Sequence, residues 1–370
     1  MVAPPLPEEG DLRRIILHNL PLIDLRAPLE FNEGSLPTAT NLPLMSDEER
    51  HQVGLCYAEE GQEEAIALGH ELVEGEVKAA RVQQWQQFAQ AYPEGLIFCW
   101  RGGMRSKISQ QWLFAASGIR YPRIVGGYKA VRRFLLDEID RIAAGIPLLI
   151  LGGRTGTGKT LLLQPLPQAV DLEGMAHHRG SAFGPRATPQ PTQINFENRL
   201  AVALIQLEAS TRHPLLIEDE GRNIGSRTVP EKLYQRMAQA PLLLLEASLE
   251  ERISITHREY IEEALQEYRD LHGEETGFEL WSQYLFQSLD KIRKRLGGLR
   301  HQTLRQQLEQ ALLRHHSHDD PSEHRGWIAT LLRDYYDPMY DYQLSRKQER
   351  IHFRGSYQQI LDYLRDHSPE

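Results

Sequence analysis

The stretch with the clearest chemistry surrounds the cysteine at position 99. An apolar run, Gly95–Phe98, predicts a buried strand that ends at Cys99, and Lys107–Ala116 has helical periodicity. Between them two adjacent glycines lie between two arginines, in the order Trp100, Arg101, Gly102, Gly103, Met104, Arg105 and Ser106. Glycine lets successive N–H groups turn inward and a helix N-terminus adds positive potential, so this loop is suited to an anion beside a thiolate nucleophile. We therefore predict that Cys99 is catalytic and that residues 100–106 form its anion cradle; a buried structural cysteine would not need these neighbours.

A second motif for phosphate chemistry begins at residue 152. Leu148–Leu151 predicts a buried strand, Leu161–Leu163 predicts a helix, and a Gly-x4-Gly-Lys-Thr pattern joins them. Such a loop binds a diphosphate or triphosphate on backbone amides, while Lys159 neutralises the outer oxygens and Thr160 could hold Mg²⁺. The predicted diphosphate-binding residues are Gly153, Arg154, Thr155, Gly156, Thr157, Gly158, Lys159 and Thr160.

Further polar residues are candidates for this second site. The apolar strand Leu215–Ile217 ends in the acids Glu218–Glu220, the form of the acidic strand that usually lies beside a phosphate loop. Strand alternation puts Asp219 on the opposite side from the two glutamates and leaves the choice of ligand open. Residues 174–184 form a loop that we expect to be too rich in Gly, His and Arg for the core. The second-site candidates are Glu218, Asp219, Arg222, His178 and Arg179.

Histidine spacing predicts no metal site. His177 and His178 are adjacent, so they are unsuited to converge on one ion. The run from His315 to Asp320 has no matching cluster elsewhere, and we expect it to be a polar loop between helices.

A basic stripe contains Lys291, Arg293, Lys294 and Arg295 and continues to Arg300 and Arg305. Taken alone, the stripe is typical of a solvated helix face. The formal net charge of −9 over 370 residues excludes a protein that is basic all over, but a local stripe can still bind nucleic acid.

Composition and pattern also predict the domain organisation. Two cysteines cannot build a disulfide framework, and the chain shows neither a signal peptide nor an apolar run of membrane-spanning length, so we expect a cytoplasmic protein that does not enter a membrane. Alternating short strands and helices predict an α/β fold with parallel sheets. We predict a first domain over residues 1–135, a linker over 136–147, a phosphate-loop domain over 148–250, a helical insertion or lid over 251–336, and a return to the phosphate-loop domain over 337–370.

Glycines are the expected helix breaks. In the helical region 48–91 they are Gly54, Gly61, Gly69 and Gly75, and in the region 250–336 they are Gly273, Gly277, Gly297 and Gly298.

Residues 11–135 resemble the rhodanese fold. The matching parts are Asp24-Leu25-Arg26, the small-residue and Pro turn from Gly34 to Pro43, and the loop that starts at Cys99. Ordinary sulfurtransferases of that fold have one residue fewer between the cysteine and the arginine. The longer Cys-x5-Arg loop resembles that of rhodanese-type dual-specificity phosphatases, which suits a larger anion than a sulfane sulfur.

Four blocks in order resemble the tRNA 2-selenouridine synthase family. They are Cys99–Ser106, Gly152–Thr160, Asp171–Gly184 and Glu218–Gly225. The resemblance implies a rhodanese-like domain followed by a P-loop NTPase-like domain in a transferase that converts 2-thiouridine at the tRNA wobble position to 2-selenouridine. It implies an S-geranylated intermediate made from geranyl diphosphate, and selenophosphate as the selenium donor. It implies no tightly bound cofactor and is compatible with the use of Mg²⁺.

The resemblance also distributes roles. It implies that Cys99 accepts selenium as a perselenide within its cradle, that the loop at Gly153–Thr160 stabilises the leaving diphosphate, and that the basic stripe contacts the anticodon stem-loop. The alternative is a Cys-x5-Arg phosphatase fused to a kinase-like phosphate loop, although Phe98 stands where such phosphatases usually have His. A tRNA-binding or nucleotide-sensing module without catalysis would leave Cys99 without a purpose.

Overall fold

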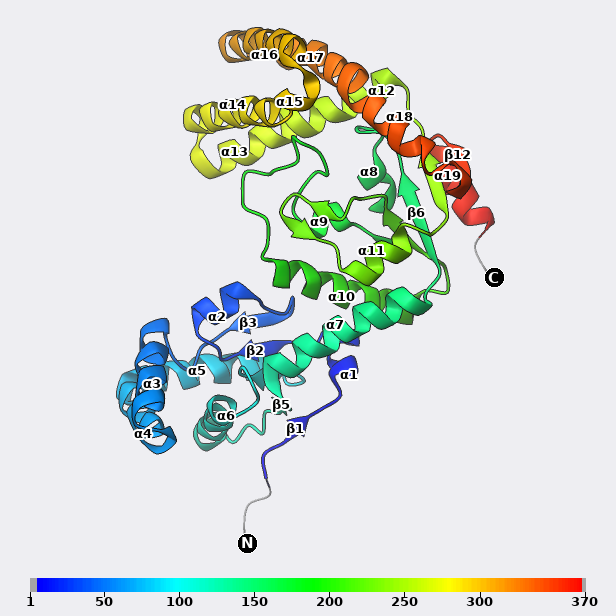
Figure 1. Ribbon diagram of the computed structural model, residues 1–370. Coiled ribbons are helices and arrows are strands. Elements are labelled where there is room, and N and C mark those ends of the chain that lie inside the picture. The colour runs from blue at the N-terminus through cyan, green and yellow to red at the C-terminus, as the bar shows by residue number, and fades with distance from the viewer. Residues whose placement is uncertain (1–4, 368–370) are drawn as a thin grey trace. The chain divides into compact units, whose positions relative to one another are not determined.

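Two parallel β-sheets organise the chain, one in each of two structural units (Figure 1). The computed structural model describes residues 5–367. One unit contains the described residues up to Ile142 together with Thr192–Ala209, and the other contains Ala143–Pro191 and the described residues from Ser210 onward. The predicted fold class, two α/β parallel-sheet domains, is confirmed.

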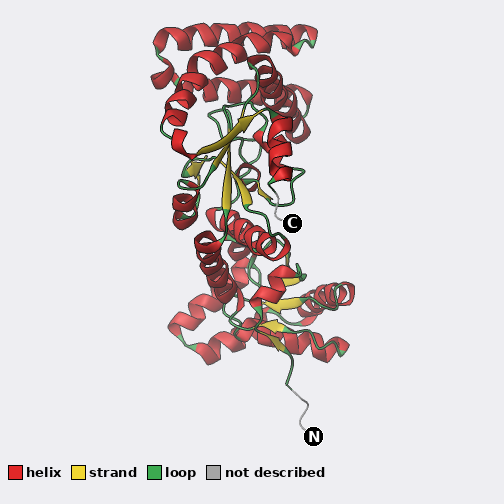
Figure 2. Cartoon of the chain, turned by 90° about the vertical axis from the view of Figure 1, so that its right-hand side faces the viewer, coloured by secondary structure: helices red, strands yellow, loops and turns green. Residues whose placement is uncertain are grey.

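The first sheet has the strand order β1-β5-β4-β2-β3, and all its pairings are parallel. Its central strands β2 and β4 are buried along their whole length, which explains why they contain the apolar runs Leu22-Ile23 and Leu96-Ile97-Phe98. Figure 2 shows the strands surrounded by helices. The strands are β1 (Glu8–Glu9), β2 (Leu22–Asp24), β3 (Ala39–Asn41), β4 (Leu96–Phe98) and β5 (Arg123–Ile124).

Within the described residues, eight helices belong to the first unit. They are α1 (Leu12–Leu17), α2 (Pro28–Glu33), α3 (Asp47–Glu59), α4 (Gln62–Leu72), α5 (Gly75–Ala91), α6 (Met104–Ser117), α7 (Gly127–Gly145) and α10 (Gln193–Ser210). Of these, α7 and α10 each extend past one of the unit's boundaries. Helix α7 continues through most of the stretch that we expected to be a linker. Helix α10 groups with the first unit, although its residues fall within the range that we assigned to the phosphate-loop domain.

Two of the expected glycine breaks in this unit are wrong. Gly54 and Gly69 lie inside α3 and α4, because a glycine in a helix interior costs only about 1 kcal/mol relative to alanine. The chain does turn at Gly61 and Gly75, where φ is +105° and +53°. These positive φ angles, which other residues rarely adopt, separate the helices.

The second sheet has the strand order β12-β11-β6-β8-β7, again with parallel pairings. The C-terminal strand β12 pairs with β11, so the end of the chain returns to the sheet after a long helical block. A short antiparallel hairpin, β9 with β10, lies outside this sheet. The strands are β6 (Leu148–Gly152), β7 (Ala169–Val170), β8 (Leu215–Glu218), β9 (Asn223–Ile224), β10 (Arg227–Thr228), β11 (Leu242–Leu245) and β12 (Ile351–Gly355).

Short helices follow the strands of this sheet, and longer ones form the helical block. The helices of the second unit are α8 (Lys159–Leu163), α9 (Leu172–Met175), α11 (Glu231–Met237), α12 (Leu249–His257), α13 (Ala264–His272), α14 (Glu274–Lys291), α15 (Arg293–Leu296), α16 (Gly298–His318), α17 (His324–Leu331), α18 (Asp337–Ser345) and α19 (Tyr357–Asp366). Two π-helical segments, Arg258–Glu263 and Leu332–Tyr336, and two 3₁₀ turns, Pro321–Glu323 and Gln348–Arg350, interrupt them. No helix within residues 5–367 combines the length and the apolar character that crossing a membrane requires.

The helical block differs from prediction at two places. Gly277 is inside α14, where a Cβ atom would lie 2.7 Å from the Cα atom of Arg269, so this glycine allows α13 and α14 to approach closely. His315–His318 form the last turn of α16 rather than a loop, and His315 is buried against His324 with 3.3 Å between ring nitrogens. The His315 ring packs edge-on against Trp281, with 5.6 Å between ring centroids, so packing on the helical block keeps this segment helical.

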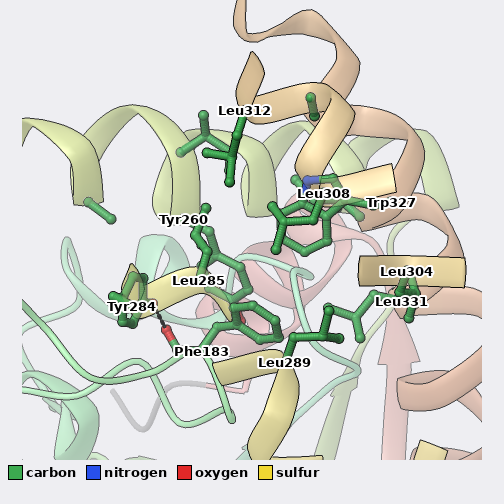
Figure 3. Close-up of a cluster of buried hydrophobic side chains, with 14 of the residues drawn as sticks. Phe183, Tyr260, Tyr284, Leu285, Leu289, Leu304, Leu308, Leu312, Trp327 and Leu331 are labelled. Carbon is green, nitrogen blue, oxygen red and sulfur yellow. Dashed lines mark hydrogen bonds between the residues drawn. The ribbon is translucent and has the colours of Figure 1, made fainter. Parts of the chain in front are cut away.

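The core of the block includes a residue from the loop that follows α9 (Figure 3). Phe183 is fully buried, and its ring stacks on Tyr260 with 5.5 Å between ring centroids. The hydroxyl of Tyr284 donates to the Phe183 carbonyl oxygen. The expectation that this loop stays out of the core is therefore wrong at Phe183, because one aromatic side chain anchors an otherwise polar segment.

Candidate functional site

Cys99 follows β4 directly and lies at the N-terminal end of α6, as the sequence predicts. Its side chain is buried, with the residue 3 % exposed. The thiol contacts the Ser106 hydroxyl at 3.3 Å, and that hydroxyl donates to the Gly103 carbonyl oxygen at 3.1 Å. Ser106 therefore links the thiol to the turn that starts α6.

The Cys99 loop packs backbone to backbone against the first residues of α7. The amides of Tyr128 and Lys129 donate to the carbonyl oxygens of Cys99 and Trp100, each at 2.9 Å. A Cβ atom on Gly127 would lie only 2.3 Å from both the Cys99 carbonyl oxygen and the Gly102 amide nitrogen. Because Gly102 and Gly127 both have positive φ, this approach needs glycine at each position.

A fully buried ion pair supports the same loop. Arg26 donates to both carboxylate oxygens of Asp24, and its guanidinium lies 3.7 Å from the ring centroid of Tyr128. Burial raises the pKa of Asp24, although the contacts with Arg26 oppose that shift. Arg26 also donates to the Gly34 carbonyl oxygen at 2.7 Å, so this strand-end motif holds the following segment in place.

The two arginines of the loop have different surroundings. Arg105 donates to both carboxylate oxygens of Glu30, at 2.6 and 3.1 Å. Burial opposes ionisation of Glu30, but the contact with Arg105 lowers its pKa overall. Arg101 is exposed and forms no ion pair among residues 5–367. The charge of Arg105 is therefore shared with Glu30, and Arg101 is the cradle arginine without such a partner.

The phosphate loop connects β6 to α8 in the predicted strand–loop–helix arrangement. Gly156 and Gly158 have φ of +79° and +82°, which turns the backbone around the loop. The Lys159 ammonium reaches back to the Gly153 carbonyl oxygen at 3.4 Å. Burial opposes the charge of Lys159, but Tyr340 and the acids around it raise the pKa of Lys159 overall.

A buried arginine, Arg252, holds the phosphate loop in place. Arg252 donates through Nε to the Thr155 carbonyl oxygen at 2.9 Å and forms a two-point ion pair with Asp337, at 2.6 and 3.1 Å. A Cβ atom on Gly156 would lie 2.8 Å from the Arg252 carbonyl oxygen. The loop is thus packed tightly on α12 and tied through Arg252 to the start of α18.

The loop opens into a cavity of about 250 Å³. Its lining includes the loop residues from Thr155 to Leu161 and charged side chains from several other elements, namely Asp171, Glu173, Arg179, Arg186, Arg258, Glu259 and Glu263. The last three come from the π-helical segment, a kind of distortion that is frequent at functional sites. Sequence periodicity carried no signal for them, whereas Asp171 and Glu173 follow a strand end, where parallel sheets bind ligands.

Acidic residues crowd the inner side of this cavity. The Thr160 hydroxyl donates to Glu218 at 3.4 Å, and the Glu173 amide donates to the other Glu218 oxygen at 3.1 Å. Burial, together with the charge of Glu173, raises the pKa of Glu218 and of Glu220 well above the ordinary range. Burial and the same charge raise the pKa of Glu259 to about 7.

The structure separates the five second-site candidates. Glu218 lies against Thr160, and His178 and Arg179 line the cavity. Asp219 instead forms an ion pair with Lys347 at 2.6 Å, and Arg222 pairs with Glu231 at 3.1 Å. Alternation along the strand end explains this result, since Asp219 projects away from Glu218.

His178 and Arg179 are held by specific contacts. Burial and the nearby cationic charges lower the pKa of His178 to about 4. Its Nδ1 accepts from the Gly180 amide at 3.1 Å, so the neutral ring carries its proton on Nε2. Arg179 and Arg186 both donate to Glu267, at 2.8 and 2.5 Å.

Three of the four basic-stripe candidates, Arg293, Lys294 and Arg295, are exposed on the short helix α15, while Lys291 ends α14 and lines a second cavity. Within the described range 5–367, no group of three or more His, Cys, Asp and Glu side chains is arranged to hold a metal ion. Thr160 and Glu218 are nevertheless oxygen donors of the kind that Mg²⁺ prefers beside a bound polyphosphate.

The fold and these two sites define a class of protein: a P-loop NTPase-like domain combined with a parallel-sheet domain that presents a buried cysteine at a helix N-terminus. A family model described as tRNA 2-selenouridine synthase AAA domain matches residues 146–370. Relatives named tRNA 2-selenouridine synthase match almost the whole chain. The protein of Marinobacter nauticus is 50% identical over 97% of this chain and 98% of its own. That of Hahella chejuensis is 53% identical over 96% and 93%, and that of Cupriavidus pinatubonensis 51% over 98% and 99%. The chain belongs to the tRNA 2-selenouridine synthase family.

Proposed function

We propose that this chain is a cytoplasmic transferase that converts 2-thiouridine at the wobble position of tRNA to 2-selenouridine in two steps. The first step makes S-geranyl-2-thiouridine from geranyl diphosphate, and the second exchanges geranylthiol for selenium supplied by selenophosphate. The observation that carries the proposal is that one chain of this family combines a buried cysteine beside a helix N-terminus with a glycine-rich strand–loop–helix segment that opens into its own cavity.

In the first step the thiocarbonyl sulfur attacks the geranyl carbon that bears the diphosphate. A C–S bond forms, the C–O bond breaks, the diphosphate leaves with the electron pair, and the base releases its N3 proton. Loop amides and Lys159 suit the charge that develops on the leaving oxygen, because they are in place before the reaction. Thr160 and Glu218 would hold Mg²⁺, which would supply further charge neutralisation.

In the second step the Cys99 thiolate attacks carbon 2 of the base, a C–S bond to Cys99 forms, the C–S bond to the geranylthio group breaks, and geranylthiol leaves with a proton. The selenium of selenophosphate then attacks the same carbon, a C–Se bond forms, and Cys99 leaves as its thiolate. Water cleaves the P–Se bond, so that phosphate leaves and 2-selenouridine remains. The exposed Arg101 and the amides at the start of α6 suit the negative charge of selenophosphate. Salt-dependent phosphate contacts from Lys291, Arg293, Lys294 and Arg295 would hold the anticodon stem-loop.

Two substitutions separate the steps. Cys99→Ser is expected to abolish selenation while geranylated tRNA accumulates, and Cys56→Ser, at the other cysteine, is the matched control. Lys159→Ala is expected to stop geranylation first, with Lys232→Ala on α11 as its control. Mass spectrometry of tRNA nucleosides measures both products.

If Cys99→Ser lost geranylation to the same extent as selenation, the assignment of Cys99 to the second step alone would be contradicted. Nucleotide-dependent turnover without geranyl diphosphate, or rapid hydrolysis of an aryl phosphate, would favour the phosphatase and kinase-like alternative. The Arg105–Glu30 pair weakens that alternative, since the arginine of such a loop must be available to a phosphate.

A further inference from the structure

A second cavity, of about 560 Å³, adjoins the phosphate-loop cavity. The two cavities share four lining residues, His178, Gly180, Ser181 and Arg186. The rest of its lining comes from the loop segment up to Gln190, from the turn between β9 and β10, and from Lys291 at the end of α14. Its volume is in the range of cavities that enclose small organic ligands.

The charges of the two cavities differ. The phosphate-loop cavity has several carboxylates, whereas the described lining of the second cavity contains Arg186 and Lys291 and no carboxylate. Arg186 is paired with Glu267, and Lys291 forms no ion pair within residues 5–367. The chain as a whole has a net charge of −9, so a cavity with only cationic charged residues in its described lining favours a polyanionic ligand at this place.

The walls of this cavity are fixed before any ligand binds. The Gln190 amide donates to the carbonyl oxygens of Ala176 and Ile224, at 2.8 and 3.0 Å. Its oxygen accepts from the amide and the hydroxyl of Ser226, at 2.7 and 2.9 Å. His177 bonds to Thr188 at 2.7 Å. The Gln190 side chain therefore ties the loop to the hairpin turn, and the hydrogen bond between His177 and Thr188 links two parts of the loop to each other.

The wall shared by the two cavities contains a neutral hydrogen-bond donor, the ring of His178. A Cβ atom on Gly184 would lie 2.3 Å from the His178 ring, and one on Gly225 would lie 2.8 Å from it, so the ring fits between two glycines. With Nδ1 occupied by the Gly180 amide, the remaining polar group of the ring is the Nε2–H donor. A hydrogen-bond donor without charge suits a base edge better than a phosphate.

We infer that this second cavity is the nucleoside subsite, which receives the flipped-out wobble nucleotide of tRNA with Lys291 on its phosphodiester and the base next to the phosphate-loop cavity. This inference rests on the proposed function. Enzymes that act on a base in a folded nucleic acid extrude it into such a pocket. The adjacent cavities would bring the thiocarbonyl sulfur to the geranyl diphosphate.

Two variants of the full-length protein test the subsite. Lys291→Glu reverses the cavity cation, and Lys232→Glu, at an exposed lysine of α11 that lines neither cavity, is its matched control. Ala187→Phe fills the cavity without changing charge and keeps the backbone bond from residue 187 to Glu267.

The probe is an anticodon stem-loop with 2-thiouridine at the wobble position. We expect Lys291→Glu to weaken its binding roughly tenfold and to reduce the dependence on salt by about one phosphate contact. Ala187→Phe should raise KM for the stem-loop, and both variants should bind geranyl diphosphate as tightly as the parent protein. A stem-loop with photoreactive 4-thiouridine at that position should crosslink within residues 185–190 or 223–226.

Crosslinks confined to other segments, or equal binding by the Lys291→Glu and Lys232→Glu proteins, would overturn the subsite. Failure of the proposed function is a separate result, since the parent protein would then form no geranylated nucleoside, whereas the binding and crosslinking data would still locate the base.

Discussion

Gly127→Ala is expected to disable the chemistry of Cys99 without changing any group that touches the thiol. Residue 127 precedes the amide that donates to the Cys99 carbonyl oxygen, and the turn that contains it supports the whole loop. The glycine packs against the loop backbone, so an added methyl group would push directly on the cradle.

The size of the effect follows from the geometry. The new Cβ atom would lie 2.3 Å from the Cys99 carbonyl oxygen and 2.3 Å from the Gly102 amide nitrogen, whereas non-bonded heavy atoms prefer about 3.5 Å. The loop must therefore move by roughly 1 Å, a displacement that can slow a reaction about a hundredfold. The positive φ of +59° adds about 1–2 kcal/mol of strain for alanine.

Gly118→Ala is the matched control in the same unit. Gly118 has φ of +73°, but a Cβ atom there would meet nothing within 4 Å, so this variant has the strain without the collision. Selenation and geranylation of tRNA are measured by nucleoside mass spectrometry, and thermal unfolding verifies that both variants fold. We expect selenation to fall about a hundredfold more in Gly127→Ala than in Gly118→Ala, with geranylation retained. Selenation rates within threefold of each other would refute the reasoning.

Three further predictions concern buried charges. Glu259 lines the phosphate-loop cavity and its pKa is about 7, so its side chain is neutral at pH 6 and ionised at pH 8. Titration calorimetry should therefore show that the affinity for geranyl diphosphate falls more steeply with pH in the parent protein than in Glu259→Gln. Parallel pH profiles of the two proteins would contradict this prediction. Glu30→Gln frees the charge of Arg105, so inorganic phosphate should bind more tightly. The free energy of unfolding should fall by about 1–3 kcal/mol, less than for a fully buried pair because this pair is partly exposed. Unchanged phosphate binding would show that Arg105 does not face the anion. Asp337→Asn removes the carboxylate from the buried Arg252 and should lower the free energy of unfolding by about 3 kcal/mol and weaken diphosphate binding; full stability in denaturant titrations would show that Arg252 needs no partner.

The backbone parts of both sites could be predicted from the sequence because they are local. A strand, a glycine-containing turn and a helix N-terminus follow one another within a few residues at Cys99 and again at Lys159. The positive φ angles of Gly102, Gly156 and Gly158 turn the backbone of these loops. The order of the elements likewise predicts two parallel sheets.

Glycines inside helices show where this local reasoning ends. Gly61 breaks the chain, but Gly69 lies within a helix, and Gly277 provides space for the neighbouring helix. The intrinsic cost of a helical glycine is small, so the surrounding packing decides the outcome.

The sequence by itself predicted the two strand–loop–helix segments, their order and the family of the chain. Only the tertiary structure decided which charges are available: Glu30 lies 75 residues before its partner Arg105, and Glu267 lies 88 residues after Arg179. It also decided that Glu218 rather than Asp219 contacts Thr160. The physical reason is that a cradle of amides depends on the φ and ψ angles of adjacent residues, whereas the partner of a buried charge is supplied by whichever distant element packs against it.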